Sequence, residues 1–205
     1  MNANATLSVA GDRRGGHGID AGIGLWVFMG VVTTLFLLFV TAYVMRMDGA
    51  DWSAIAMPWQ LWLSTALLTA AGVLLQQASL AARGAHWVRV RNRLLAGGAC
   101  TWAFLAVQLW AWQALYALRV MPAGNPAASF FYLLTALHGL HVAGGLVAWG
   151  VTTYGIWHSP DPARTAWRIA LCARYWHFLL AVWALLFATL SGLTPDVVRF
   201  ICGTA

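Results

Sequence analysis

Five separate stretches of the sequence are long and apolar enough to cross a lipid bilayer. They cover residues 22–45, 61–82, 94–118, 130–157 and 169–193. A membrane-spanning helix needs about 20 predominantly apolar residues, and a helix satisfies its own backbone hydrogen bonds inside hydrocarbon. Of the 205 residues, 61% are hydrophobic and 9% are charged, which is too apolar for a soluble domain. We therefore expect an all-α integral membrane protein, a bundle of five transmembrane helices in a single domain over residues 22–193.

The arginines predict how this bundle is oriented in the membrane. All twelve basic residues are Arg, and nine of them lie before the first span, between the second and third, or between the fourth span and the first turns of the fifth. These nine are Arg13, Arg14, Arg83, Arg89, Arg91, Arg93, Arg164, Arg168 and Arg174, whereas the opposite side has Arg46, Arg119 and Arg199. Basic residues are retained on the cytoplasmic side. We therefore expect a cytoplasmic N-terminal tail over residues 1–21 and a periplasmic C-terminal tail over residues 194–205.

Few side chains in this sequence could support acid–base or metal chemistry. The chain contains no Lys or Glu, and its six Asp residues lie outside the spans or at their edges. Cys100, Cys172 and Cys202 show neither Cys-x-x-Cys nor Cys/His zinc spacing. We expect no catalytic residue and no metal site in this chain, and membrane lipid as a partner in place of nucleic acid.

The stretch FFYLLTALHGLHVAGGLV, residues 130–147, places two histidines inside the fourth span. At 100° per residue, His138, His141 and Gly145 fall within an arc of about 60°. A second arc, roughly opposite, contains the small residues Gly139, Ala143 and Gly150. Small residues permit close helix approach, and imidazoles need hydrogen-bond partners in hydrocarbon. We therefore expect the fourth helix to be packed on both sides.

The fifth span carries a similar stripe at steps of four and three residues. Its members are His177, Ala181, Ala184, Ala188 and Ser191. Such a stripe predicts a close-packing seam with one imidazole at its cytoplasmic end. Gln108 and the pair Gln76–Gln77 are the other amides within spans, and we interpret them as interhelical hydrogen-bonding groups.

Three interpretations of the histidine pair stay open on spacing alone. Two ligands at i and i+3 could bind a metal, but no Cys or Asp occupies the same depth. A haem would need a second helix, and His177 is the only remote partner. A proton-carrying role is the third interpretation. We favour hydrogen bonding between helices.

Two motifs carry a resemblance to a known family. HGLHV at His138–Val142 follows the aromatic pair Phe130–Phe131, and RYWHFLLAVW covers Arg174–Trp183. Weaker motifs are GLWVFM, PWQLWLSTALL and FLAVQLWAW, which begin at residues 24, 58 and 104. In this order the motifs resemble subunit III of the haem-copper terminal oxidases, the cytochrome c and quinol oxidases, in the short five-helix bacterial form.

The resemblance implies a non-catalytic subunit in the bacterial inner membrane. It would pack against catalytic subunit I, in a complex with subunit II, in aerobic electron transfer coupled to oxygen reduction and proton translocation. The haem and copper would be bound by the partner subunits, and this chain would bind phospholipid. Its structural, interface or lipid-binding candidates are His138, His141, His177, Tyr175, Trp176, Gln108, Gly139 and Gly145.

The chain also departs from the family pattern. Where the family usually has intramembrane acids, this sequence has Val32, Ala111 and Leu180. Any proton-antenna role of subunit III carboxylates is therefore not expected here. An accessory protein of a nitric oxide reductase is the alternative within the same superfamily. A two-histidine membrane haem protein and a small carrier are alternatives from other classes.

Overall fold

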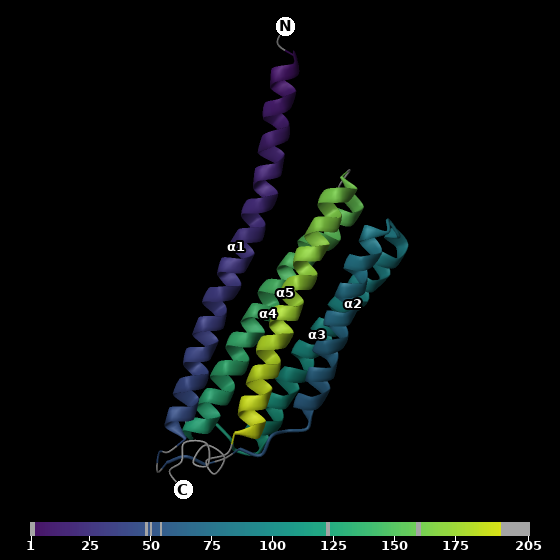
Figure 1. The fold of residues 1–205 in the computed structure, drawn as a ribbon. Coiled ribbons are helices and arrows are strands. Elements are labelled where there is room, and N and C mark those ends of the chain that lie inside the picture. Colours follow the sequence, from purple (N-terminus) through teal and green to yellow (C-terminus); the bar gives the residue numbers. More distant parts are fainter. Residues whose placement is uncertain are drawn as a thin grey trace. The chain divides into compact units, whose positions relative to one another are not determined.

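The protein is all-helical in a computed structural model that describes residues 3–47, 49, 51–53, 55–121, 124–158 and 161–193, with side chains from residue 22 onward. The described helices are α1 (Ala3–Arg46), α2 (Gln60–Arg83), α3 (Trp87–Ala117), α4 (Pro126–His158) and α5 (Pro162–Gly192), as Figure 1 shows. Each contains a stretch long and apolar enough to cross a membrane, which in α1 begins at Gly22. The predicted fold class of five spanning helices is confirmed, and the chain is a multi-pass membrane protein.

The chain divides into two compact units, residues 1–35 and residues 36–205. The first unit contains most of α1. The second unit contains the last turns of α1, from Phe36, together with α2, α3, α4 and α5. The second unit holds all of the sequence motifs around His138 and His177.

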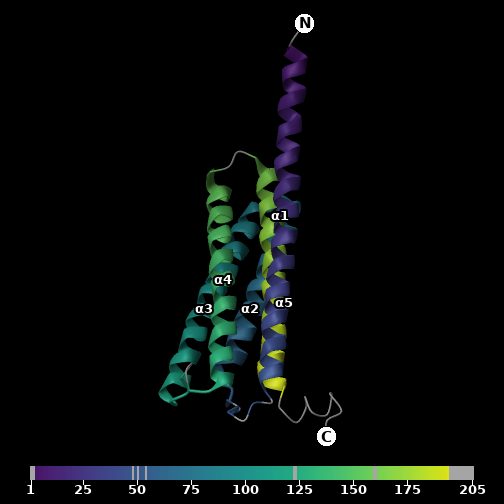
Figure 2. The ribbon, with the colours of Figure 1, turned by 90° about the vertical axis from the view of Figure 1, so that its left-hand side faces the viewer.

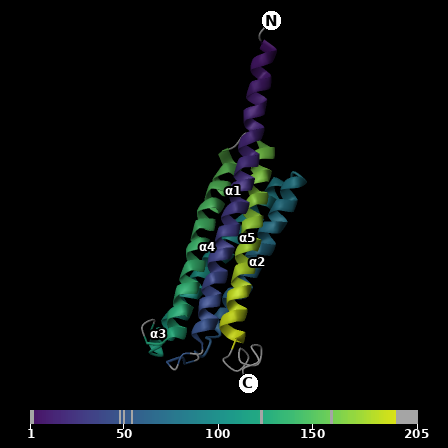
Figure 3. The same ribbon diagram turned by 60° about the vertical axis from the view of Figure 1, so that its left-hand side comes forward.

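Within the second unit, α2 to α5 form an antiparallel bundle. α2 packs on α3 and α5, and α4 also packs on α3 and α5, so the four helices form a closed circuit (Figure 2). The pairing of α2 with α5 can be followed in Figure 3. The largest fully buried side chains of this unit are aromatic: Trp176, Trp183, Phe104 and Phe131.

Several helices begin earlier than hydropathy predicts. α3 begins at Trp87 and not at residue 94, and α5 begins at Pro162 and not at residue 169. α1 begins at Ala3, inside the segment expected to be a tail. Hydropathy marks only the part of a helix suited to hydrocarbon, whereas Arg is a good helix former and extends a helix past that part. The expected C-terminal tail over residues 194–205 lies outside the described residues.

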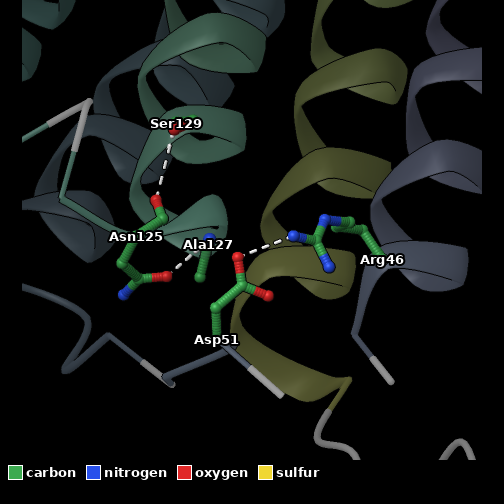
Figure 4. Close-up of polar contacts among 5 residues, drawn as sticks. All are labelled: Arg46, Asp51, Asn125, Ala127 and Ser129. Atoms are coloured by element: carbon green, nitrogen blue, oxygen red, sulfur yellow. Dashed lines mark hydrogen bonds and ion pairs between the residues drawn. The ribbon is translucent and has the colours of Figure 1, made fainter. Parts of the chain in front are cut away.

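Both α4 and α5 begin with a capping residue followed by proline. The Ala127 N–H donates to Asn125 Oδ1 at 2.7 Å, so Asn125 caps α4, as Asn followed by Pro in the sequence indicates (Figure 4). Asp161 Oδ1 accepts from the N–H groups of Ala163 and Arg164 at 3.0 and 3.2 Å. Proline fits this first helical position because its missing N–H would lack an intrahelical partner there.

The loop between α1 and α2 is tied to the rest of the second unit by polar contacts. Asn125 Nδ2 donates to the Ser53 carbonyl and to Ser53 Oγ, at 2.8 and 2.6 Å. Arg46 and Asp51 form an ion pair at 2.6 Å (Figure 4). Both partners of the ion pair are exposed, so it contributes at most about 1 kcal/mol. The Asn125 contacts therefore hold this loop against the start of α4.

Candidate functional site

His138 lies in the centre of the bundle, enclosed by aromatic rings from three other helices. The Trp183 ring of α5 is 5.1 Å from the imidazole, between centroids, and the Phe104 ring of α3 is 6.0 Å away. The Phe36 ring of α1 is 6.5 Å away, edge to face. His138 is 1% exposed. This aromatic enclosure fixes the plane of the imidazole without using its nitrogens.

Two predicted site residues are buried without a hydrogen-bond partner. Neither ring nitrogen of His138 and neither side-chain polar atom of Gln108 has a partner among the described residues. Gln108, predicted as an interhelical hydrogen-bonding amide, thus forms no such bond to another described side chain. We favoured hydrogen bonding between helices for His138, but no described residue bonds to its ring nitrogens.

His141 joins α4 to α5 through its backbone. Its ring Nδ1 lies 2.7 Å from the carbonyl oxygen of Leu137, so Nδ1 donates within α4. The Tyr175 hydroxyl of α5 donates to the His141 carbonyl at 3.1 Å. The Phe36 ring packs 5.6 Å from the imidazole. The two histidines therefore differ: the ring nitrogens of His138 have no hydrogen-bond partner among the described residues, whereas His141 bonds through its ring within α4 and through its carbonyl to Tyr175 of α5.

Three tryptophan–threonine hydrogen bonds connect all four helices of the bundle, and we call them the Trp–Thr links. They join Trp112 to Thr135, Trp176 to Thr101, and Trp183 to Thr65, at 3.1, 3.0 and 2.9 Å. In each link the indole N–H donates, and the threonine hydroxyl donates in turn to the carbonyl four residues earlier. A hydroxyl can do both because it has one donor and two acceptor sites.

Reasoning from the sequence missed the Trp–Thr links: Trp176 was a site candidate, and Trp112 and Trp183 lie in the quoted motifs, but none was paired with a threonine. Each interhelical hydrogen bond in a membrane contributes about 0.6 to 2 kcal/mol, so three of them stabilise one rotation of each helix. A signal was present, since Thr65, Thr101 and Thr135 lie well inside spans. Matching each threonine to its tryptophan requires the register between helices, which the sequence does not provide.

The predicted glycines of α4 face different surroundings. A Cβ added at Gly145 would meet Tyr175 Cε1 at 3.0 Å and Trp176 Cη2 at 3.1 Å, so this glycine permits close approach of α4 and α5. A Cβ added at Gly139 or Gly150 would meet nothing within 4 Å. Gly139 therefore mediates no close approach among the described residues, so the packing expected for this arc of α4 is not found there.

A further glycine, Gly98 of α3, was not singled out from the sequence. A Cβ there would collide with the indole of Trp149 on α4, whose N–H donates to the Leu94 carbonyl at 2.9 Å. The Trp149 ring thus lies across α3 where no side chain is present. Gly98 and Gly145 are the positions at which α4 comes closest to α3 and to α5 respectively among the glycines of these helices.

The stripe predicted on α5 is exposed along its whole length. Its members are His177, Ala181, Ala184, Ala188 and Ser191. The His177 Nδ1 lies 2.8 Å from the Ala173 carbonyl, within the same helix. The described residues therefore do not supply the close packing expected along this stripe. The stripe is a continuous surface of small side chains on a membrane-spanning helix.

The described side chains do not gather into a metal site. No group of three or more His, Cys or Asp side chains capable of holding a metal ion is found among them. Cys172 is buried and Cys100 is half-buried, both as free thiols. Cys202 lies outside the described residues.

Comparisons with known proteins confirm the resemblance to subunit III of the haem-copper oxidases. The chain is 38% identical over 97 residues to cytochrome c oxidase subunit 3 of Thermostichus vulcanus, a stretch that covers 44% of each protein. It is 32% identical over 85 residues to cytochrome bo(3) ubiquinol oxidase subunit 3 of Pseudomonas aeruginosa, covering 42% of this chain and 41% of the relative.

A third relative is cytochrome c oxidase subunit 3 of a Synechocystis strain, 36% identical over 88 residues. That match covers 41% of this chain and 35% of the relative. The matched stretches thus span about two fifths of the length of these curated relatives. No family model matches the chain.

Proposed function

We propose that the chain is subunit III of a respiratory haem-copper oxidase, a non-catalytic subunit that packs against catalytic subunit I and stabilises it. The observation that carries this proposal is the similarity to subunit 3 of both a cytochrome c oxidase and a ubiquinol oxidase. The complex would reduce oxygen and translocate protons, with haem and copper in its partner subunits. The electron donor, cytochrome c or quinol, is left open, because relatives of both kinds match.

The proposed orientation follows the arginine distribution. It places the chain in a bacterial inner membrane with a cytoplasmic N-terminus and a periplasmic C-terminus. The loop between α2 and α3 and the loop between α4 and α5 would then face the cytoplasm. The variants Gly84→Cys and Ser53→Cys test this orientation from both sides, by accessibility labelling of each new cysteine in intact cells.

The exposed stripe of α5 supports the proposed contact with subunit I. Small side chains allow two helices to approach closely and gain van der Waals contact, which drives association in lipid where the hydrophobic effect between helices is absent. The Trp–Thr links form inside the bundle and use no residue of the α5 stripe, so the stripe stays available to a second protein. The His177 ring, with Nδ1 used inside α5, can offer Nε2 as an acceptor to that protein.

Co-purification tests the proposal. The full-length chain, affinity-tagged and expressed in its native host, should bring down a subunit with a reduced-minus-oxidised haem spectrum in mild detergent. Replacing Ala184 and Ala188 by Trp should reduce the recovered haem at least about tenfold, because two indoles would block close approach. The matched control, Val147→Trp on the exposed face of α4, should retain the partner.

Three outcomes would contradict parts of this proposal. Recovery of the wild-type chain as a free monomer without haem would reject the role as an oxidase subunit. Recovery with a nitric oxide reductase would favour the alternative role in that system. Equal loss of haem in the α5 variant and in Val147→Trp would reject the α5 stripe as the contact surface.

Phospholipid is the second proposed ligand class, and an apolar groove supports it. The groove has a volume of about 930 Å³ and lies between α3 and α4, where it is lined by Trp112, Tyr116, Tyr132 and Leu133 among others. An acyl chain fits such a groove because it offers apolar contact without hydrogen bonds. Leu133→Trp should fill the groove and lower the phospholipid retained after delipidation, measured by mass spectrometry. Leu140→Trp, also exposed on α4, is the control.

A further inference from the structure

Two polar side chains inside the bundle need a partner that the described part of the protein does not supply. Gln108 of α3 is 4% exposed and His138 of α4 is 1% exposed. Neither polar atom of the amide and neither ring nitrogen is paired with another group among the described residues. Buried polar groups are almost always partnered by protein or ordered water, because an unpaired group loses its hydration without compensation. The pair therefore indicates a binding site for a small polar molecule.

The neighbours of Gln108 place it against the part of α4 that carries His138. Phe104, one turn before Gln108, has its ring 6.0 Å from the His138 ring. Trp112, one turn after Gln108, donates to Thr135, which lies one turn before His138. Residues four apart share one face of a helix. Gln108 therefore faces α4 between these two contacts.

The directions of the two side chains converge. α3 and α4 run antiparallel (Figure 2). Side chains on a helix lean toward the N-terminus of their own helix. Gln108 therefore leans toward the level of Phe104, and His138 leans toward the level of Thr135. In an antiparallel pair these directions meet in the space between the two helices.

The surroundings of this space select a small, neutral guest. Phe36, Phe104 and Trp183 pack around the His138 ring, and the buried residues that the structure describes include no Asp or Arg. An ion would lack a counter-charge in these surroundings. The amide offers two donors and an acceptor, and a neutral imidazole offers one of each. A guest that both donates and accepts matches this set, and water makes about three such bonds in buried sites.

We propose that Gln108 and His138 hold a buried water molecule between α3 and α4. The water bridges the amide to the imidazole, which fixes the tautomer of His138 and the rotamer of Gln108. It adds one more polar connection between α3 and α4, at a level of the bundle where aromatic rings pack around the imidazole. The site belongs to this chain alone and does not depend on which complex the chain joins.

Solid-state NMR of the full-length chain in lipid nanodiscs tests the proposal. With ¹⁵N-labelled histidine, magnetisation transferred from water protons should reach the ring nitrogens of His138, whose signals are identified by their loss in His138→Phe. Gln108→Leu should abolish this transfer because it removes the other holder of the water. Gln76→Leu, which removes an exposed amide from α2, is the matched control and should leave the transfer unchanged.

Two results would overturn the water site. One is the absence of water transfer to His138 in the wild-type chain. The other is a through-hydrogen-bond coupling between the side-chain nitrogen of Gln108 and a ring nitrogen of His138, which would show a direct bond without water. Both are read on the wild-type chain and need no result from Gln108→Leu, and assignment of the His138 signals by sequential correlations in the wild-type chain replaces His138→Phe if that variant fails to fold.

Discussion

The interior of the bundle and the outward face of α5 contain the same types of residue in opposite surroundings. Inside, Gly145 lies against the rings of Tyr175 and Trp176, and His138 is enclosed by aromatic side chains. Outside, the small residues of the α5 stripe and His177 are exposed. In both places a histidine accompanies small side chains at helical spacing. Residue type alone therefore does not distinguish a surface that holds the fold from one available to a partner.

The difference lies in hydrogen bonds between helices. At Gly145 the close contact is accompanied by a polar link across helices, since Trp176, which lies against this glycine, donates to Thr101 of α3. The polar groups of the α5 stripe bond within α5: His177 to the Ala173 carbonyl and Ser191 to the Phe187 carbonyl. A hydrogen bond across helices thus accompanies the interior contact at Gly145, whereas His177 and Ser191 of the α5 stripe bond within α5 and can face lipid or protein without losing those bonds.

The largest expected effect is on Gly145. Gly145→Leu would force a branched side chain into Tyr175 and Trp176, which are already 3.0 to 3.1 Å from a Cβ at this position. Overpacking a filled interface costs about 1–3 kcal/mol, and we expect the upper end of that range because two large rings must move. The free energy of unfolding in mixed micelles, measured by SDS titration, reports this loss.

Gly139→Leu is the matched control for this prediction. It lies on the same helix and gains the same side chain, but a Cβ there meets nothing within 4 Å. We expect its unfolding free energy to differ from wild type by less than about 0.5 kcal/mol. Equal destabilisation by the two variants would mean that the two faces of α4 do not differ as the structure indicates.

A smaller effect is expected at the Trp–Thr links. Trp176→Phe removes the indole N–H that binds Thr101 Oγ1 and should cost about 1 kcal/mol from the hydrogen bond, with added loss of ring contacts. Thr101→Val tests the same bond from the other side, and a double-mutant cycle isolates the pair term. Trp102→Phe, at an exposed ring, is the control. A pair term near zero would show that the hydrogen bond between Trp176 and Thr101 does not stabilise the bundle.

The sequence predicts the helices and one cap well because these depend on local chemistry. Asn125 followed by Pro126 marks the start of α4 in the sequence and in the structure. Asp161 followed by Pro162 carries the same signal for α5, although the apolar stretch predicted as the fifth span begins only at residue 169. A local capping signal is the better guide to a helix start, since hydropathy reports only where hydrocarbon is tolerated.

Which face of a membrane helix points inward is much harder to predict. In a soluble protein the apolar face marks the interior, but lipid and protein interior are equally apolar in a membrane. The residue spacing therefore identified the stripe of α5, but it did not predict that the stripe is exposed. For the same reason we expected both arcs of α4 to be packed, the one with Gly145 and the one with Gly139, although only Gly145 lies against aromatic rings. The roles of His138, His141 and the other candidates in binding lipid or a partner stay predictions.

The smallest expected effect concerns His177, and it tests the outward surface most directly. His177→Leu should leave the unfolding free energy of the chain unchanged, because the ring is exposed and its Nδ1 bonds only back to the Ala173 carbonyl among the contacts described for it. The loss should appear in the amount of haem-containing partner that co-purifies. An interhelical hydrogen bond averages about 0.6 kcal/mol, which corresponds to about a threefold weaker association. A His177→Leu chain that unfolds more easily but retains its partner fully would show that the imidazole stabilises the fold and does not bind the partner. The distinction between the bundle interior and the outward face of α5 would then fail at this residue.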